Sequence, residues 1–129
     1  MKLHIIILLL LFSVAVYAQK TPRLLENPAK LELIQKTIRQ MYNWELSQAQ
    51  SNLSSFSKGF EKHPAVPFTK AMIMYWQNAP LDLFGTVFPK HEKLLLEASD
   101  LAETMLDEDE EDIEAIFFKM AARSLLMKY

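Results

Sequence analysis

The stretch PFTKAMIMYW, residues 67–76, is apolar at eight of its ten positions, and only Thr69 and Lys70 interrupt it. A helix that is apolar on almost every side is normally buried between other helices, whereas a surface helix carries one apolar stripe. We therefore interpret this stretch as a core helix. Two alternatives stay open: a partner-binding groove with Tyr75 and Trp76 at its rim, and membrane insertion, for which the following chain offers no basic amphipathic face.

The apolar pattern of this stretch repeats at two fixed offsets along the chain. An offset of 34 residues relates two sets of apolar residues: Ile34, Ile38 and Met41 to Phe68, Met72 and Tyr75. An offset of 49 residues relates two more: Leu46, Ala49, Leu53 and Phe56 to Leu95, Ala98, Ala102 and Met105. The longer offset also carries Phe68 onto Phe117. The two offsets agree if 15 residues are inserted between the third and fourth helices, which indicates internal repeats.

Local signals predict helices along the whole chain after residue 28, because it has only two glycines and no sustained alternation of polar and apolar residues. Helix starts are predicted at five places: Pro28 after Asn27, a capping box from Ser47 to Gln50, Pro64, about His91, and Ile113 after Asp112. Helical spacing assigns core-facing stripes to the first and second helices: Leu31, Ile34, Ile38, Met41 and Tyr42, then Ala49, Leu53, Phe56 and Phe60. It does the same for the fourth and fifth: Leu94, Leu95, Ala98, Leu101, Ala102, Met105 and Leu106, then Ile113, Ile116, Phe117, Met120, Ala121 and Leu125.

Helix–turn–helix units with a period of 34 residues resemble the tetratricopeptide repeat. Ala49 and Leu53 match the small and large positions of that repeat's second helix, and a second set matches again: Ala98, Ala102 and Met105. The proline that usually ends each unit is replaced by Glu61 and Glu110, and the usual Trp and Gly of the first helix are missing. The resemblance covers about residues 29–128.

This resemblance implies an all-α fold of antiparallel helix pairs, stacked as a short tetratricopeptide-like α-solenoid of about two and a half repeats. It also implies an adaptor that binds proteins or peptides and performs no catalysis, as in secreted bacterial proteins of this type. An unrelated helical bundle is the alternative fold. The alternative function is a small helical carrier or enzyme that holds an apolar ligand between its helices.

The N-terminus predicts export. Lys2 precedes an apolar run from Ile5 to Val16, and the segment ending at Ala18 fits a signal-peptidase site, so residues 1–18 are predicted to be a signal peptide. We expect residues 19–28 to be a linker and residues 29–129 to form one helical domain, located in the periplasm or secreted. No membrane span is expected after cleavage.

Net charge and cysteine content restrict the class of partner and the chemistry that the chain can support. The formal net charge of −2 becomes −3 without Lys2, which argues against nucleic acid as a partner. The chain has no cysteine, so disulfides and thiolate chemistry are excluded.

Residues 77–90 form the predicted insertion, and an insertion in a repeat array often carries the binding face. We therefore predict partner-binding residues there and at the end of the preceding helix: Tyr75, Trp76, Leu83, Phe84 and Phe88. The alternative is a loop folded back over its own repeat.

No pattern in the sequence predicts a catalytic, cofactor-binding or metal-binding residue. Ten acidic residues and no basic one lie between Glu97 and Glu114, and we interpret this segment as a solvated turn, since it lacks the glycine of a calcium-binding loop. The spacing of His63 and His91 does not match a zinc site. The serines of residues 51–57 lack the G-x-S-x-G pattern that surrounds a nucleophilic serine.

The last predicted helix, residues 113–128, is the first half of a third repeat. Its Phe118, Leu126 and Met127 lie off the predicted stripe and have no evident cover. We expect either that the chain is a fragment of a longer protein or that this helix docks onto a partner or a second copy.

Overall fold

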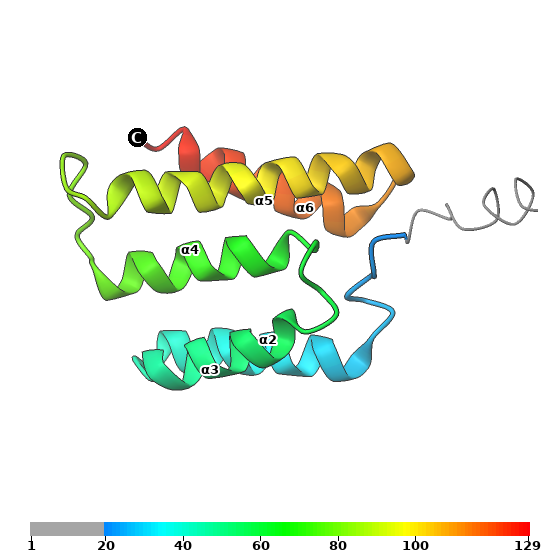
Figure 1. Cartoon of the computed structure of the whole chain (residues 1–129), viewed down its shortest axis with the longest axis horizontal. Coiled ribbons are helices and arrows are strands. Elements are labelled where there is room, and N and C mark those ends of the chain that lie inside the picture. The colour runs from blue at the N-terminus through cyan, green and yellow to red at the C-terminus, as the bar shows by residue number, and fades with distance from the viewer. Residues whose placement is uncertain (1–19) are drawn as a thin grey trace, which may run out of the picture.

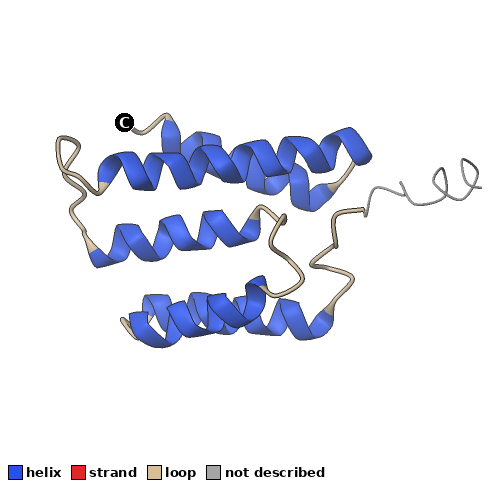
Figure 2. Ribbon diagram, viewed as in Figure 1, coloured by secondary structure: helices blue, strands red, loops and turns tan. Residues whose placement is uncertain are grey.

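A computed structural model describes residues 20–129, so the predicted signal peptide lies outside the described residues. The described part contains five α-helices and no strand, which confirms the all-α class (Figures 1 and 2). The helices are α2 (Pro28–Tyr42), α3 (Leu46–Ser57), α4 (Ala65–Gln77), α5 (Phe88–Glu108) and α6 (Ile113–Leu126). Within residues 20–129, no helix combines the length and the apolar character needed to cross a bilayer.

Each helix packs against the next one along the chain, and α4 occupies the centre. It contacts all four other helices, with α2 and α3 on one side and α5 and α6 on the other (Figure 1). Ala71 and Ile73, both within the stretch of residues 67–76, are fully buried, and Phe68, Met72 and Trp76 pack against the core. This central position explains why α4 is apolar on most sides and confirms its interpretation as a core helix.

Two of the predicted helix caps are confirmed. The Asn27 side chain accepts a hydrogen bond from the Lys30 N–H at 3.1 Å, and the Asp112 carboxylate accepts one from the Ala115 N–H at 2.9 Å. The capping box predicted at Ser47 is wrong, because α3 already begins at Leu46 and has no side-chain cap.

The predicted core stripe of α3 is buried, and that of α5 is buried in part, since Leu94, Leu101 and Leu106 are only partly covered. Phe56 of α3 and Leu95 and Met105 of α5 are fully enclosed. One core cluster runs through the fold: Leu24, Ile34, Met41, Ala49, Leu53, Phe56, Phe60, Ala65, Ile73, Ala102 and Phe118.

The stripe predicted for α6 is wrong. Phe117 is 58% exposed, and Ile113, Ile116 and Met120 are exposed as well. The buried side of α6 is instead formed by four other residues: Glu114, Ala115, Phe118 and Ala122. One residue corresponds to about 100° of helix rotation, so choosing Phe117 rather than Phe118 turns the whole helix away from its true orientation. The expectation that Phe118 lacks cover is corrected by the same observation.

The segment between α4 and α5 is shorter than predicted. Irregular backbone runs from residue 78 to residue 87, and α5 begins at Phe88, three residues before the predicted start at His91. Phe88 is therefore a helical residue, half-buried against Tyr129 with ring centroids 5.2 Å apart.

Candidate functional site: an apolar groove between α2, α4 and α6

An apolar depression of about 510 Å³ lies between α2, α4 and α6 and is named the helical groove below. Its walls come from α2 and α6, its floor from α4, and one end from the segment before α2. Polar side chains in the lining are limited to Gln35, Tyr42, Thr69 and Glu114. The other lining residues are Leu24, Leu25, Leu31, Ile34, Ile38, Met41, Phe68, Met72, Ile113, Phe117 and Phe118.

The repeated positions of the sequence meet in this groove. Ile34, Phe68 and Phe117, which the offsets of 34 and 49 residues relate, all line it. Ile38 and Met72, related by the offset of 34, line it as well. Residues related by the two offsets therefore line one depression, although Met120 is 66% exposed whereas Ala71, to which the 49-residue offset relates it, is fully buried.

Large side chains stand exposed on both walls of the helical groove. Tyr42 of α2 is 61% exposed, Ile38 is partly exposed, and Phe117 and Ile113 stand opposite them on α6. Soluble monomers seldom expose large contiguous apolar patches without a function, so these walls are a candidate binding surface.

A buried hydrogen-bond centre closes one end of the helical groove. The Glu114 carboxylate, on a residue that is only 8% exposed, accepts hydrogen bonds from the Leu24 N–H at 2.8 Å and the Leu25 N–H at 2.7 Å. The His63 ring contributes a third bond, from Nε2 to Glu114 Oε2 at 2.8 Å. These contacts fix the two leucines at the end of the groove.

The tautomer of His63 follows from its partners. Nδ1 accepts a hydrogen bond from the Ala65 N–H at 3.1 Å, so the proton of the neutral ring lies on Nε2 and is donated to Glu114. Burial lowers the pKa of His63, and the nearby Glu114 carboxylate only partly opposes this shift. Both ring nitrogens are thus engaged inside the fold, and His63 holds Glu114 in place instead of facing a ligand.

Residues 20–27, named the N-terminal strap below, are also held by charged contacts with the end of α5. Arg23 pairs with Asp112 through Nε and with Glu108 through Nη2 at 3.3 Å, while Thr21 Oγ1 donates to Glu108 Oε1 at 2.7 Å. Burial alone would raise the pKa of Glu108, but the hydrogen bonds from Thr21 and the charge of Arg23 outweigh it and hold this pKa below its usual value. The acidic segment is therefore more than the solvated turn predicted, because Glu108, Asp112 and Glu114 anchor the strap.

Tyr75 and Trp76 lie at the end of α4, close to the opposite end of the helical groove. The Trp76 ring makes edge-to-face contacts with Tyr42, Trp44 and Tyr75, with centroid distances of 5.8–5.9 Å. Its Nε1 is buried and has no hydrogen-bond partner within residues 20–129. Trp44 is exposed and has a positive φ of 62° at the turn between α2 and α3. This aromatic cluster joins the wall helix α2 to the floor helix α4.

The other predicted site residues lie elsewhere. Leu83 and Phe84 are on the loop after α4, and Phe84 is 100% exposed. Phe88 is linked to Tyr75 only through two intervening rings. The Phe88 ring packs edge-to-face on Tyr129 at a centroid distance of 5.2 Å, and Tyr129 packs edge-to-face on His91 at 6.0 Å. The His91 ring in turn lies 6.2 Å from the Tyr75 ring. Ring contacts thus connect Tyr75, Trp76 and Phe88, whereas Leu83 and Phe84 extend from the loop between α4 and α5.

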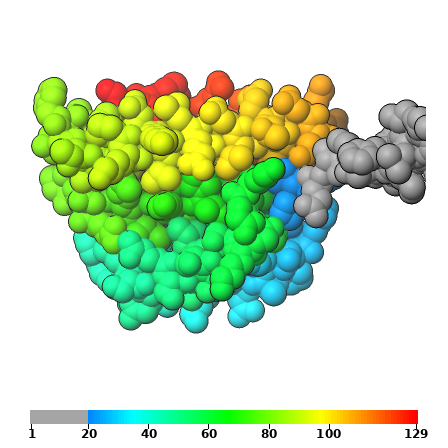
Figure 3. All heavy atoms as spheres, in the orientation of Figure 1, coloured from blue at the N-terminus to red at the C-terminus, as the bar shows by residue number. Residues whose placement is uncertain are grey.

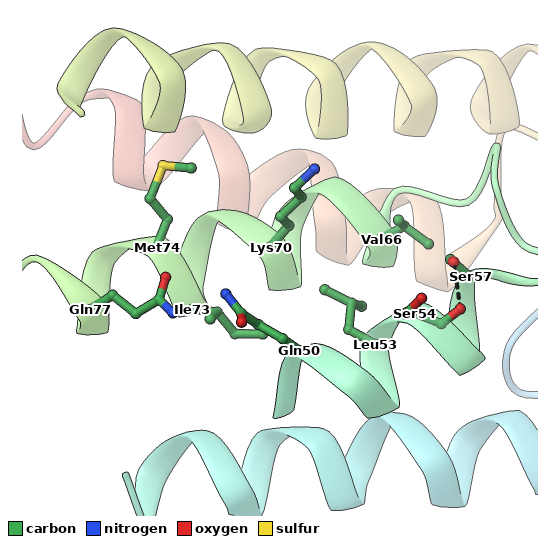
Figure 4. Close-up of a pocket in the computed structure, with 9 residues that line it drawn as sticks. All are labelled: Gln50, Leu53, Ser54, Ser57, Val66, Lys70, Ile73, Met74 and Gln77. Carbon is green, nitrogen blue, oxygen red and sulfur yellow. Dashed lines mark hydrogen bonds between the residues drawn. The ribbon is translucent and has the colours of Figure 1, made fainter. Parts of the chain in front are cut away.

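Figure 3 shows the molecule as spheres in the orientation of Figure 1, with α5 above α4 and α3 below α4. A second depression, of about 390 Å³, lies between α3 and α4 (Figure 4). The lining is mixed: Gln50, Leu53, Ser54, Ser57, Val66, Lys70, Ile73, Met74 and Gln77. Ser57 Oγ donates to the Ser54 carbonyl at 2.8 Å, so this hydroxyl is engaged by its own helix.

Side chains that commonly bind metal ions do not cluster in the part of the chain that the structure describes. Residues 20–129 contain no group of three or more His, Cys, Asp or Glu residues placed to hold an ion. Comparisons with protein-family models, with curated proteins and with solved structures find no match to the chain.

Several residues that shape the groove were missed by the sequence analysis as functional residues. Gln35 was not considered, and Ile38, Tyr42 and Phe117 were assigned to the core. A signal was present, because the 34- and 49-residue offsets mark the same faces of three helices. His63 and Glu114 carried no such signal, since 51 residues separate them in the sequence.

Proposed function

We propose that this chain is an exported, non-enzymatic interaction module with a tetratricopeptide-like arrangement, and that its helical groove binds the apolar face of a partner helix. The observation that carries the proposal is the set of large apolar side chains exposed on both groove walls. The shared placement of the repeat-related residues Ile34, Phe68 and Phe117 supports the stacked arrangement of α2, α4 and α6.

The shape and chemistry of the groove favour a helical partner. An amphipathic helix commonly inserts apolar residues at i, i+3, i+4 and i+7 into such a trough. The α2 wall presents Leu31, Ile38 and Tyr42, which span about three helical turns, so a partner segment of about 12–15 residues fits its length. Burying each additional large apolar side chain contributes about 1.5–3 kcal/mol before the cost of association.

The test uses a labelled helical peptide selected from a displayed library against the protein and then measured by fluorescence anisotropy. Phe117→Asp places a charge in the apolar wall, and we expect it to raise the peptide Kd at least about 10-fold, because the charge must be desolvated. The matched control is Phe84→Asp, which changes the same residue type at a fully exposed loop position. If selected peptides bind the Phe117→Asp variant as tightly as the control, the groove is not the binding site.

The loop residues form a second, separate part of this proposal. Leu83, Phe84 and Phe88 would contact the partner beside the groove, with Tyr75 and Trp76 at its rim. Phe84→Ala and Phe88→Ala test this arrangement in the same anisotropy assay. If both variants keep the peptide affinity and the thermal stability of the parent protein, these residues have no docking role.

A small apolar ligand is the second candidate occupant, favoured by the groove volume. About 510 Å³ falls within the range of about 300–1,000 Å³ typical of small-molecule sites, and the lining is mostly apolar. Native mass spectrometry of protein purified from an exporting bacterial host distinguishes the two candidates. A bound lipid-sized mass that Phe117→Asp removes would support a carrier and contradict the peptide-binding module. The same spectra give the N-terminus, and a first residue other than Gln19 would contradict the predicted signal cleavage.

A further inference from the structure

The outer face of α6 is a second apolar surface, which adjoins the wall of the helical groove at Ile113. It consists of Ile113, Ile116, Met120 and Met127, whose exposed fractions lie between 41% and 80%. Of these four, Ile113 alone also borders the groove. They lie on the opposite side of the helix from Phe118, which faces the core.

Three of these residues are placed symmetrically about Met120, whereas Ile116 has Ser124 at its mirror position. Ile113 and Met127 lie seven residues before and after Met120, which is about two helical turns in each direction. In an antiparallel helix pair related by a twofold axis through Met120, Met120 would meet its own copy and Ile113 would meet Met127 of the second chain. Such an isologous contact uses the same patch on both copies.

Charge limits where this contact can lie. Lys119 turns toward α5 and pairs with Glu103. Arg123 is exposed and lies next to Ile116 and Met127 in helical angle, although its Nε donates to Ser99 Oγ at 3.3 Å. Its guanidinium must therefore stay at the edge of the contact, where water reaches it.

The exposed area is close to what a stable dimer requires. The four residues are between 41% and 80% exposed, and together they supply on the order of several hundred Å² of exposed surface per copy. A standard interface buries about 800 Å² per partner, of which about 57%, or roughly 450 Å², is apolar.

We propose that two copies of this chain associate as a twofold dimer through the outer face of α6, with Met120 on the axis. This dimer goes beyond the proposed function and does not depend on it. The groove variants and the dimer variants change different residues, so either proposal can fail alone.

The first test measures mass in solution by sedimentation velocity, using protein purified from an exporting host across a range of concentrations. We expect a dimer, and we expect Met120→Glu to raise the dimer Kd by roughly 100-fold, because two like charges would face each other across the axis. The matched control is Leu96→Glu, a partly exposed apolar residue of α5 outside this face. Circular dichroism confirms that both variants are folded.

The second test uses the absence of cysteine from the chain. A single Met120→Cys substitution should form a disulfide-linked dimer on oxidation, whereas Leu96→Cys should not. A mixture of Ile113→Cys and Met127→Cys proteins should give cross-linked heterodimers and few homodimers. A monomer at every concentration, a dimer insensitive to Met120→Glu, or cross-linking in another register would each overturn the proposal.

Discussion

Glu114 is the residue whose replacement gives the clearest test of how this fold is held together. Glu114→Gln preserves the shape of the side chain but replaces one carboxylate oxygen with an NH₂ group. All three partners of Glu114 are donors, namely the N–H groups of Leu24 and Leu25 and Nε2 of His63. The amide must therefore direct a donor toward another donor, and at least one buried hydrogen bond is lost.

The size of the effect follows from the charge and burial of this site. Hydrogen bonds to charged groups contribute about 1.5–3 kcal/mol each, and a buried donor left without an acceptor costs about 1–3 kcal/mol. Because Leu25 is itself exposed and water can reach it in the variant, we expect Glu114→Gln to lower the free energy of unfolding by about 2–3 kcal/mol. A domain of this size has a total stability of about 5–15 kcal/mol, so the loss is easily measured.

Urea unfolding followed by tryptophan fluorescence measures this loss. With an m-value of about 1–3 kcal/mol per molar urea, the transition midpoint should fall by about 0.7–3 M. The matched control is Glu111→Gln, an exposed residue of the same acidic turn, which should change stability by less than about 0.5 kcal/mol. Hydrogen exchange should also show faster exchange of the Leu24 and Leu25 amides in the Glu114 variant alone. Equal stability of the two variants would show that Glu114 does not anchor the N-terminal strap.

Other predictions concern burial and protonation. Phe118→Ala should cost about 3–5 kcal/mol in urea unfolding, whereas its neighbour Phe117→Ala should cost less than about 1 kcal/mol; equal costs would contradict the observed orientation of α6. Phe84→Ala should change the melting temperature little, because the side chain is fully exposed. Burial lowers the pKa values of His63 and His91 below 6.5, so the unfolded chain binds protons at higher pH than the folded one. The free energy of unfolding should then fall as the pH decreases from about 7 to 5.5 and stay constant above 7; a flat profile would contradict this.

The helices that were predicted well have one apolar stripe each. In α3 and α5, polar residues separate the apolar ones clearly, so helical spacing alone identifies the buried side. The residues Phe56 and Leu95 were assigned to the core on this basis and are fully buried. The caps at Asn27 and Asp112 could also be predicted from the sequence, because a capping side chain binds a backbone N–H only three residues away.

The helix α6 was misjudged because it is apolar on almost every side. Its Ile116, Phe117 and Phe118 offer two or three equally plausible stripes, and spacing alone does not choose between them. Likewise, the sequence offered no signal for the N-terminal strap, whose hydrogen bonds to Glu108 and Glu114 span 85–90 residues. Polar contacts at such separation depend on the assembled fold and have no local pattern.

The orientation of α6 links these observations, because polar contacts at its start determine which apolar side chain faces which surface. Asp112 caps the helix and pairs with Arg23, and Glu114 binds the strap and His63, so both residues must point toward the interior side. With that side fixed, a rotation of about 100° per residue places Phe118 in the core, Phe117 in the groove wall and Met120 outward. Two buried carboxylates at the start of α6 thus explain why its apolar residues form a groove wall and an outer face in addition to a core stripe.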